Sequence, residues 1–435
     1  MSTLRDPETV EDLAPITSAD LGPARPRSTS ALGTLWHPQT HMPGAAEDRL
    51  VIASGDGAWV VTEDGRRLLD LPAGLWHANV GHGRERLARA AARQMSTLET
   101  YHLFGAHATR PALELAERLS EMVPIEDATV FFTSGGSDSV DTACKLARRY
   151  WQAVGLHTKR VVLSRESGYH GLHGFGTSIA GLEFNREGYG SDSLVPETAR
   201  VPRDDLAETE RIIQQIGPEN IAALVAEPVI GTGGVFPPPD GYLRGLRELT
   251  RRHGILLVAD EVITGFGRTG DWFACQRWGI EPDLITMAKG ITSGYLPLGA
   301  VAISPRVAEP FFIGRDAPIF RHGLTYSGHA TACVVAMENL DIIEEEGLVE
   351  HVRELEPVLQ NAVHELASSS LVRDVRSAGL MAGVQLVADI DGAAVVRAVR
   401  DDGVLTRLIT DNTLHISPAV RRHRRRAHGR DQQDR

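Results

Sequence analysis

The chain has 435 residues, of which 42% are hydrophobic and 23% are charged, and its formal net charge is −12. This composition is ordinary for a folded protein of about two domains and excludes a disordered chain. The acidic balance argues against general affinity for nucleic acid. The three cysteines lack disulfide or metal-ligand spacing, and the chain begins without a signal-peptide pattern, so we expect a cytoplasmic protein. No run is long and apolar enough to span a bilayer.

The first part of the chain combines a loose segment, a hairpin and helices. Residues 1–30 are rich in Pro, Ser, Thr and acidic residues, and we expect them to form a loose arm. Residues 58–71 contain two apolar runs around Asp64-Gly65, which predicts a β-hairpin with a tight turn. From about 85 to 150 the apolar residues recur with helical periodicity.

Short apolar runs then alternate with helical stretches. The runs are RVVLS (160–164), IAALVAEPV (221–229), GILLVADEV (254–262), DLITMAK (283–289) and LGAVAIS (298–304). Because these runs are apolar on both sides of the strand and do not alternate with polar residues, they predict buried strands of a parallel sheet. Residues 347–367 predict one long helix, after which the pattern is that of a smaller α+β unit.

The residues that follow each predicted strand are informative, since ligands of open parallel sheets bind outside the carboxyl ends of the strands. After FFT comes SGGSDS and then a helix, whose positions Val140, Cys144, Ala147 and Trp151 share one apolar face. Free backbone N–H groups at this helix start, together with the Ser137 hydroxyl, would hold a phosphate. The alternative is an ordinary Ser/Asp helix cap without a ligand.

Other strand ends carry aromatic and acidic residues. Tyr169 and His170 lie among glycines after one strand, where an aromatic ring could stack on a flat ligand or simply pack in the core. Glu227 and Asp260 end two buried strands, a costly place for a carboxylate without a partner. Lys289 ends the next strand.

Lysine is rare in this chain, which contains only Lys145, Lys159 and Lys289, while nearly all other basic residues are arginine. Guanidinium stays charged, so a reaction that needs a free amine requires lysine. A phosphate site, a stacking aromatic, a carboxylate for a protonated ring nitrogen and an amine for an aldehyde fit one ligand, pyridoxal 5'-phosphate. Lys289 would form its Schiff base, with desolvation lowering the pKa of the amine. A structural or surface role for Lys289 is the alternative.

Two long segments resemble a known family. The stretch LLVADEVITGFGRTG (256–270), followed by PDLITMAKGITSGYLPLGAVAIS (282–304), resembles the class III (ω-) aminotransferases, and the likeness extends from about residue 33 to about 419. GLW (74–76) and VLTRLITDNTLHISP (404–418) are similar to the ω-amino acid or amine:pyruvate branch. The resemblance implies an α/β protein of the fold type I class, with a large domain built on a mostly parallel seven-stranded sheet and a smaller α+β domain.

The resemblance also implies a domain organisation. We expect a loose arm (1–30), the first part of the small domain (31–75), the large cofactor-binding domain (76–330), the rest of the small domain (331–419) and an atypical basic tail (420–435).

Cofactor contacts are carried over from the resemblance residue by residue. It implies that Gly136 and Ser137 hold the phosphate and that Tyr169 stacks on one face of the pyridine ring. Asp260 would pair with the ring nitrogen, and Val262 would pack on the opposite face.

Further roles follow from the same resemblance. Glu227 would support Asp260 or the pocket wall, and Lys289 would be both the cofactor-binding lysine and the general base. Thr325 would reach the phosphate of a neighbouring subunit in a homodimer. Trp76 would line the substrate pocket, and Arg407 would bind a substrate carboxylate and swing aside for neutral amines.

The implied activity is transfer of an amino group from an amine or ω-amino acid to a 2-oxo acid such as pyruvate, by a ping-pong mechanism. The same cofactor residues could serve an aminomutase, a decarboxylase or a lyase. A different class of function is an inactive cofactor-binding protein.

The end of the chain departs from the family. From Val420 on, the sequence VRRHRRRAHGRDQQDR is rich in arginine and nearly free of apolar residues. Such a run is usually unstructured or binds polyanions. We favour an altered reading frame, because a shift of one base can encode Phe-Val-Val-Thr-Ala-Asp-Glu-Leu, a strand followed by a helix-capping pattern. Codons that cannot give this pattern would contradict the idea.

Overall fold

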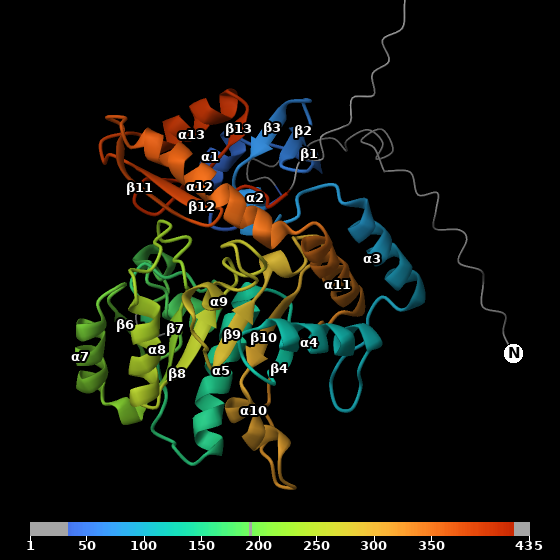
Figure 1. The fold of residues 1–435 in the computed structure, drawn as a ribbon, viewed down its shortest axis with the longest axis vertical. Helices are drawn as coiled ribbons and strands as arrows, with labels where there is room; N and C mark the ends of the chain where they lie inside the picture. The colour runs from blue at the N-terminus through green and yellow to red at the C-terminus, as the bar shows by residue number, and fades with distance from the viewer. Residues whose placement is uncertain (1–33, 191–193, 422–435) are drawn as a thin grey trace, which may run out of the picture.

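The computed structural model describes residues 34–190 and 194–421. The predicted arm at 1–30 and the tail from residue 422 on lie outside these residues. A seven-stranded sheet with the order β4-β10-β9-β8-β7-β5-β6 forms the centre of the larger part (Figure 1). Its strands are β4 (Thr129–Thr133), β5 (Val161–Arg165), β6 (Thr198–Val201), β7 (Ile221–Ala226), β8 (Leu256–Asp260), β9 (Leu284–Met287) and β10 (Gly299–Ile303).

The large sheet is mostly parallel, as predicted, with one exception. Strands β6, β5, β7, β8 and β9 pair in parallel along the sheet. Strand β10 is antiparallel to both of its neighbours, β9 and β4, so the prediction that residues 298–304 run parallel to the other strands is wrong. All five residues of β10 are buried, and burial on both faces produces the same apolar run in either direction. The connection at 288–298 is too short for a crossover, so the chain returns antiparallel.

Helices pack against this sheet and against one another. They include α3 (Glu85–Thr97), α4 (Arg110–Met122), α5 (Gly136–Ala153), α6 (Gly174–Ser178), α7 (Leu206–Ile216), α8 (Tyr242–Arg252), α9 (Ala274–Trp278), α10 (Pro305–Phe312) and α11 (Ala330–Glu345). Helix α5 contacts β4, β7, β8, β9 and β10, and the four positions of its predicted apolar face are all buried. Helix α11 packs against α3 and α4.

Two smaller sheets make up the rest of the described chain, with the orders β1-β2-β3-β13 and β11-β12-β15-β14. Their strands are β1 (Ile52–Asp56), β2 (Trp59–Thr62), β3 (Arg67–Asp70), β11 (Val372–Ala378), β12 (Met381–Leu386), β13 (Val404–Leu405), β14 (Leu408–Ile409) and β15 (Thr413–Ile416). Helices α1 (Met42–Glu47), α2 (Ala73–Trp76), α12 (Leu348–Leu366) and α13 (Gly392–Asp401) accompany them. The predicted hairpin is β2–β3, and the predicted long helix is α12.

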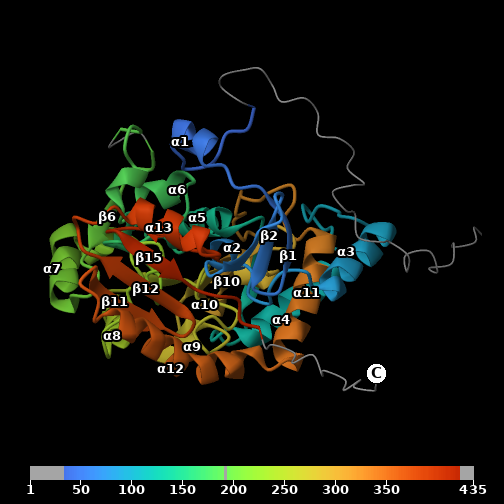
Figure 2. The same cartoon turned by 90° about the horizontal axis from the view of Figure 1, so that it is seen from above.

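The beginning and the end of the described chain meet in the first small sheet. Strand β13 pairs in parallel with β3, so residues near 404 lie beside residues near 69. Figure 1 shows both small sheets on one side of the large sheet, and Figure 2 shows them side by side from above. The domain boundaries themselves stay a prediction.

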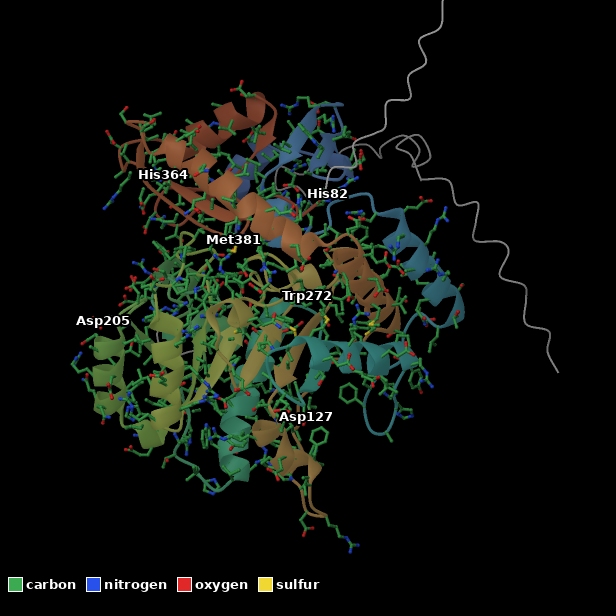
Figure 3. The ribbon with its side chains drawn as sticks, viewed as in Figure 1. His82, Asp127, Asp205, Trp272, His364 and Met381 are labelled. Carbon is green, nitrogen blue, oxygen red and sulfur yellow. The ribbon has the colours of Figure 1, made fainter. Side chains whose placement is uncertain are left out.

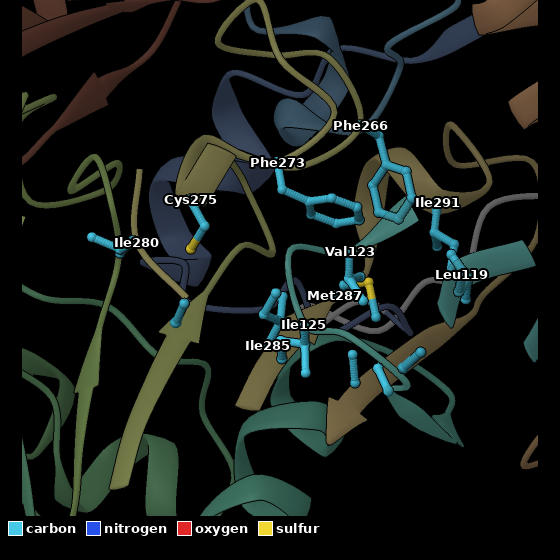
Figure 4. Packing of buried hydrophobic residues seen from close by; sticks show 14 of the residues in the cluster. Leu119, Val123, Ile125, Phe266, Phe273, Cys275, Ile280, Ile285, Met287 and Ile291 are labelled. Carbon is cyan, nitrogen blue, oxygen red and sulfur yellow. The ribbon is translucent and has the colours of Figure 1, made fainter. Parts of the chain in front are cut away.

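Hydrophobic packing joins the two parts. Trp76, Ile263 and Met381 belong to one buried cluster, although they come from α2, from the segment after β8 and from β12. Figure 3 places Met381 where the small sheets face the larger part. The main core lies deeper, where Phe266 and Phe273 pack edge to face with their ring centroids 5.3 Å apart (Figure 4). In the described part of the chain, no helix is both long and apolar enough to cross a membrane.

Candidate active site

A cavity of about 350 Å³ opens at the carboxyl ends of five strands in the large sheet. Its walls include residues 134–137 after β4, 169–171 after β5, Glu227 after β7, Asp260 with 262–263 at the end of β8, and 288–289 after β9. These residues are far apart in the sequence and meet because their strands share one sheet edge. This is where open α/β sheets bind ligands.

The start of α5 forms one wall of the cavity. Its N-cap is Gly135, and no side chain caps the helix, so the alternative of an ordinary Ser/Asp cap is wrong. The first N–H groups of an α-helix lack acceptors within the helix and attract anions. Ser137 also lines the cavity, where its Oγ accepts a hydrogen bond from the Leu172 N–H (3.2 Å). A side chain at Gly136 would collide with Val262, because its Cβ would lie 2.8 Å from Val262 Cγ1.

Asp260 is a buried carboxylate held by three donors. Its Oδ2 lies 2.8 Å from Nδ1 of His170. Its Oδ1 accepts hydrogen bonds from the Val262 N–H and the Thr286 hydroxyl, both at 3.1 Å. Together these three contacts fix the orientation of the carboxyl group. The sequence singled out His170 only as a neighbour of glycines and did not indicate Thr286, because these contacts join separate strands.

Glu227 supports the loop that carries Tyr169. Its Oε1 accepts the Tyr169 N–H, and its Oε2 accepts the Gly231 N–H, each at 2.9 Å. Burial raises the pKa of Glu227; the nearby His170 lowers it and Asp260 raises it further. Glu227 therefore orders the wall on which the Tyr169 side chain lies, beside the cavity.

Lys289 follows β9 and borders the same cavity. Its backbone has the left-handed φ of 47°, which is uncommon for a residue with a side chain and frequent at functional sites. Burial lowers the pKa of Lys289 to about 8; Asp260 and Glu227 oppose this shift, and Arg407 adds to it. At mildly alkaline pH, Lys289 is therefore a free amine in a substantial fraction of the molecules. Nucleophilic and acid–base chemistry requires this form.

Three of the predicted site residues do not line this cavity. Trp76 is 2% exposed, and Cζ of Arg407 lies 4.4 Å from the centroid of its ring. Thr325 is exposed and lies outside the cavity. By contrast, His77 lines the cavity although the sequence gave no reason to select it.

The residues present fit pyridoxal 5'-phosphate. The uncapped start of α5 suits a dianionic phosphate, and the buried carboxylate of Asp260 suits a protonated ring nitrogen. The amine of Lys289 suits an aldehyde, and the side chains of Tyr169 and Val262 border the space between them.

The chain is similar to known proteins over most of its length. Residues 42–426 match the family described as aminotransferase class-III. A putrescine–pyruvate aminotransferase of Pseudomonas aeruginosa is 40% identical over 356 residues, which cover 78% of this chain and 77% of the relative. An ω-amino acid–pyruvate aminotransferase of Pseudomonas putida is 36% identical over 383 residues, 83% of this chain and 84% of the relative.

Solved structures support the same family. An amine transaminase from an uncultivated Pseudomonas species, in its pyridoxal phosphate-bound form, has a TM-score of 0.84 and is 38% identical, covering 89% of this chain and 94% of that chain. The predicted fold class, family and cofactor are thereby confirmed. The chain belongs to the class III aminotransferases, which use pyridoxal 5'-phosphate.

Proposed function

We propose that this enzyme moves the amino group of an amine or ω-amino acid to a 2-oxo acid such as pyruvate, in a ping-pong cycle. The observation that carries the proposal is that Lys289, with a pKa of about 8, shares one cavity with Asp260 and the uncapped start of α5. The names of the two curated relatives, a putrescine–pyruvate and an ω-amino acid–pyruvate aminotransferase, support this substrate class.

In this proposal the cavity walls bind and orient the cofactor. Pyridoxal phosphate supplies an aldehyde that condenses with amines and a ring that accepts electrons from a breaking C–H bond. Gly136 and Ser137 hold its phosphate through the start of α5. Asp260 keeps the ring nitrogen protonated, and Tyr169 and Val262 confine the two faces of the ring.

Lys289 moves the proton. Its Nζ takes the proton from the substrate carbon that bears the nitrogen and returns it elsewhere on the bound molecule. A pKa of about 8 suits both the removal and the return of the proton. Near neutral pH, part of the amine is free to accept a proton, and the protonated part can give one up. Glu227 contributes indirectly, since it fixes the backbone of Tyr169.

Arg407 and Trp76 serve the substrate. Arg407 binds the carboxylate of a 2-oxo acid or amino acid through charge-assisted hydrogen bonds. Trp76 forms the surface on which this guanidinium lies. A neutral amine makes no use of the guanidinium, so Arg407 decides between carboxylate and neutral substrates.

We also propose that the enzyme is a homodimer, in which Thr325 reaches the phosphate site of the partner. Thr325 is exposed and outside its own cavity. The neighbouring segment exposes large apolar side chains, namely Phe312 (72%), Ile313 (68%), Ile319 (63%) and Tyr326 (62%). Exposed apolar surface of this kind is typical of interfaces. Sedimentation equilibrium should give the mass of a dimer, and a monomer that transaminates at full rate would contradict the proposal.

The activity itself is tested with a panel of amine donors and pyruvate, in which alanine formation is measured. We expect alanine to form with at least one diamine, ω-amino acid or arylalkylamine, and to be lost in Lys289→Ala. The exposed Lys145 offers the matched control Lys145→Ala, which should retain the activity. Carbon dioxide or ammonia release without alanine would instead indicate decarboxylation or elimination.

A further inference from the structure

Arg407 lies in the turn between β13 and β14, against two rings. Its Cζ is 4.4 Å from the centroid of the Trp76 ring, and its Nε donates a hydrogen bond to Nδ1 of His415 (3.3 Å). Among the described residues, no carboxylate pairs with Arg407. Its Nη1 and Nη2 have no acceptor in that part of the chain either, so this edge of the guanidinium is available for a ligand.

His415 is held through its backbone and by the ring of Trp76. It is fully buried in β15, and its ring centroid is 3.9 Å from that of Trp76. Its backbone N–H donates to the carbonyl of Arg407 (3.0 Å), and its own carbonyl accepts from the Thr406 hydroxyl (2.8 Å). These contacts hold the backbone and one ring face, and Nδ1 of the imidazole faces the Arg407 side chain.

The protonation of this imidazole follows from its neighbours. Nδ1 accepts a hydrogen bond, so the ring is neutral and carries its proton on Nε2. Burial, together with the positive charges of Arg407 and Arg268, lowers the pKa of His415 well below its usual value. The neutral form is thus the stable one at neutral pH.

An apolar residue would avoid an unpaired polar atom at this position. Nε2 of His415 is buried without a hydrogen-bond partner among the described residues, which is unfavourable for a polar atom. A leucine would fill much of the same space and leave no polar atom unpaired. What a leucine lacks is the Nδ1 acceptor, whose one hydrogen bond within the described ranges comes from Arg407.

We propose that His415 is a positioning residue for Arg407: its Nδ1 holds Nε of the guanidinium against Trp76, so that Nη1 and Nη2 are presented together to a substrate carboxylate. The inference rests on the carboxylate-binding role proposed for Arg407 and adds the residue that sets its geometry. With Nε fixed, the guanidinium binds a carboxylate end-on through two parallel N–H groups, and less side-chain freedom is lost on binding.

The test compares His415→Leu with His415→Asn in the holoenzyme. Leucine removes the acceptor at similar size, whereas the Oδ1 of asparagine can take the place of Nδ1. We expect His415→Leu to raise the KM for pyruvate at least about fivefold, with a change below about twofold in the half-reaction of a neutral arylalkylamine. His415→Asn should recover most of the pyruvate KM. Equal losses for both substrates, or no advantage of asparagine over leucine, would overturn the proposal.

A double-mutant cycle separates this inference from the proposed function. If His415 acts through Arg407, then His415→Leu adds little to the pyruvate KM of Arg407→Ala, whereas independent effects would multiply. If Arg407→Ala leaves the pyruvate KM unchanged, the carboxylate role itself is wrong. If Arg407→Ala raises it and His415→Leu does not, only the positioning role fails. Should His415→Leu fold poorly, His415→Asn is compared with His415→Gln instead. The carbonyl of glutamine lies nearer the place of Nε2, so equal pyruvate KM values for the two variants would contradict the proposal.

Discussion

Nδ1 of His170 lies 2.8 Å from Oδ2 of Asp260, and both side chains are buried. The imidazole comes from the loop after β5, whereas the carboxylate ends β8. Because an ionised carboxylate only accepts hydrogen bonds, His170 donates from Nδ1 and thereby sets the orientation of Asp260. The second ring nitrogen, Nε2, is buried without a partner in the described chain. The histidine thus contacts Asp260 and also lines the cavity.

His170→Phe should lower the transamination rate about 10- to 100-fold, since a hydrogen bond to a charged group contributes about 1.5–3 kcal/mol. The phenyl ring fills the space but cannot donate. Single-turnover kinetics with a saturating amine measure the effect. His170→Asn, which can still donate, should lose less than His170→Phe. A phenylalanine variant with the wild-type rate would exclude a role for this hydrogen bond.

Asp260→Asn should lower the rate by several orders of magnitude while the affinity for the cofactor falls much less. The amide keeps the size of the side chain but removes the charge that holds the ring nitrogen protonated. In this variant kcat should therefore fall far more than the cofactor affinity, which equilibrium dialysis measures. Substitution of Glu261, a buried carboxylate of the same segment, provides the control. Glu261 accepts N–H groups at the start of α9, so its loss should affect the stability of the protein instead of the protonation of the cofactor ring. Unchanged kinetics in Asp260→Asn would remove Asp260 from the mechanism.

Arg407→Ala should lower the activity toward carboxylate substrates more than the activity toward neutral amines. Loss of a charge-assisted pair costs about 1.5–3 kcal/mol, so kcat/KM for pyruvate should fall about 10- to 100-fold. The neutral arylalkylamine should show a smaller loss, which reflects the packing of Arg407 on Trp76. The two half-reactions are measured separately, and equal losses would reject a selective role.

Much of the fold could be predicted because burial leaves a local pattern. The run at 254–262 is apolar up to Ala259 and contains β8, and Asp260 ends that strand. The parallel arrangement then brings Asp260 and Lys289 to one cavity, although the sequence contains no direct sign of their contact. Conversely, the direction of β10 leaves no local trace, since both of its faces are buried. Periodicity therefore predicts that an element exists more reliably than it predicts the element's direction.

The rest of the site depends on tertiary contacts. The support of Asp260 by His170 joins two strands, and the contact of Arg407 with Trp76 joins two distant parts of the chain. At the end of the described chain, the Val420 N–H donates to the carbonyl of Asn79 (2.7 Å), and Val420 is buried. The proposed change of reading frame begins at Val420, its residues 422–435 lie outside the described chain, and it stays a prediction.

Removal of the cofactor should reveal the titration of Lys289. Its pKa is lowered to about 8, so in the cofactor-free protein the reactive amine appears as the pH rises through about 8. The rate at which added pyridoxal phosphate forms its visible absorbance band should therefore increase with pH, with a midpoint near 8. Free Nα-acetyl-lysine should need a pH near 10.4 for the same fraction of amine. A midpoint near that of free lysine would contradict the assigned environment.

The contacts of Lys159 account for a lysine at this position, in a chain whose basic residues are nearly all arginine. Its Nζ donates to three carbonyls, those of Pro218 (2.9 Å), Ile221 (3.0 Å) and Gly254 (2.9 Å), and lies 4.6 Å from the Trp151 ring centroid. Burial lowers the pKa of Lys159 to about 8, so at neutral pH it still carries three N–H donors. The ammonium matches three carbonyls that converge on one point, whereas the planar guanidinium of arginine does not.

Lys159→Met should therefore lower the free energy of unfolding by about 2–4 kcal/mol. Each buried carbonyl left without a donor costs about 1–3 kcal/mol, and part of this is offset because no charge has to be buried. Lys159→Arg should also destabilise, since its charge is kept but its geometry does not fit. The control is Lys145→Met at an exposed position of α5, where a change within about 0.5 kcal/mol is expected. Urea unfolding of the holoenzyme at neutral pH measures all three, and equal stabilities of Lys159→Met and Lys145→Met would show that the three carbonyls do not need the ammonium.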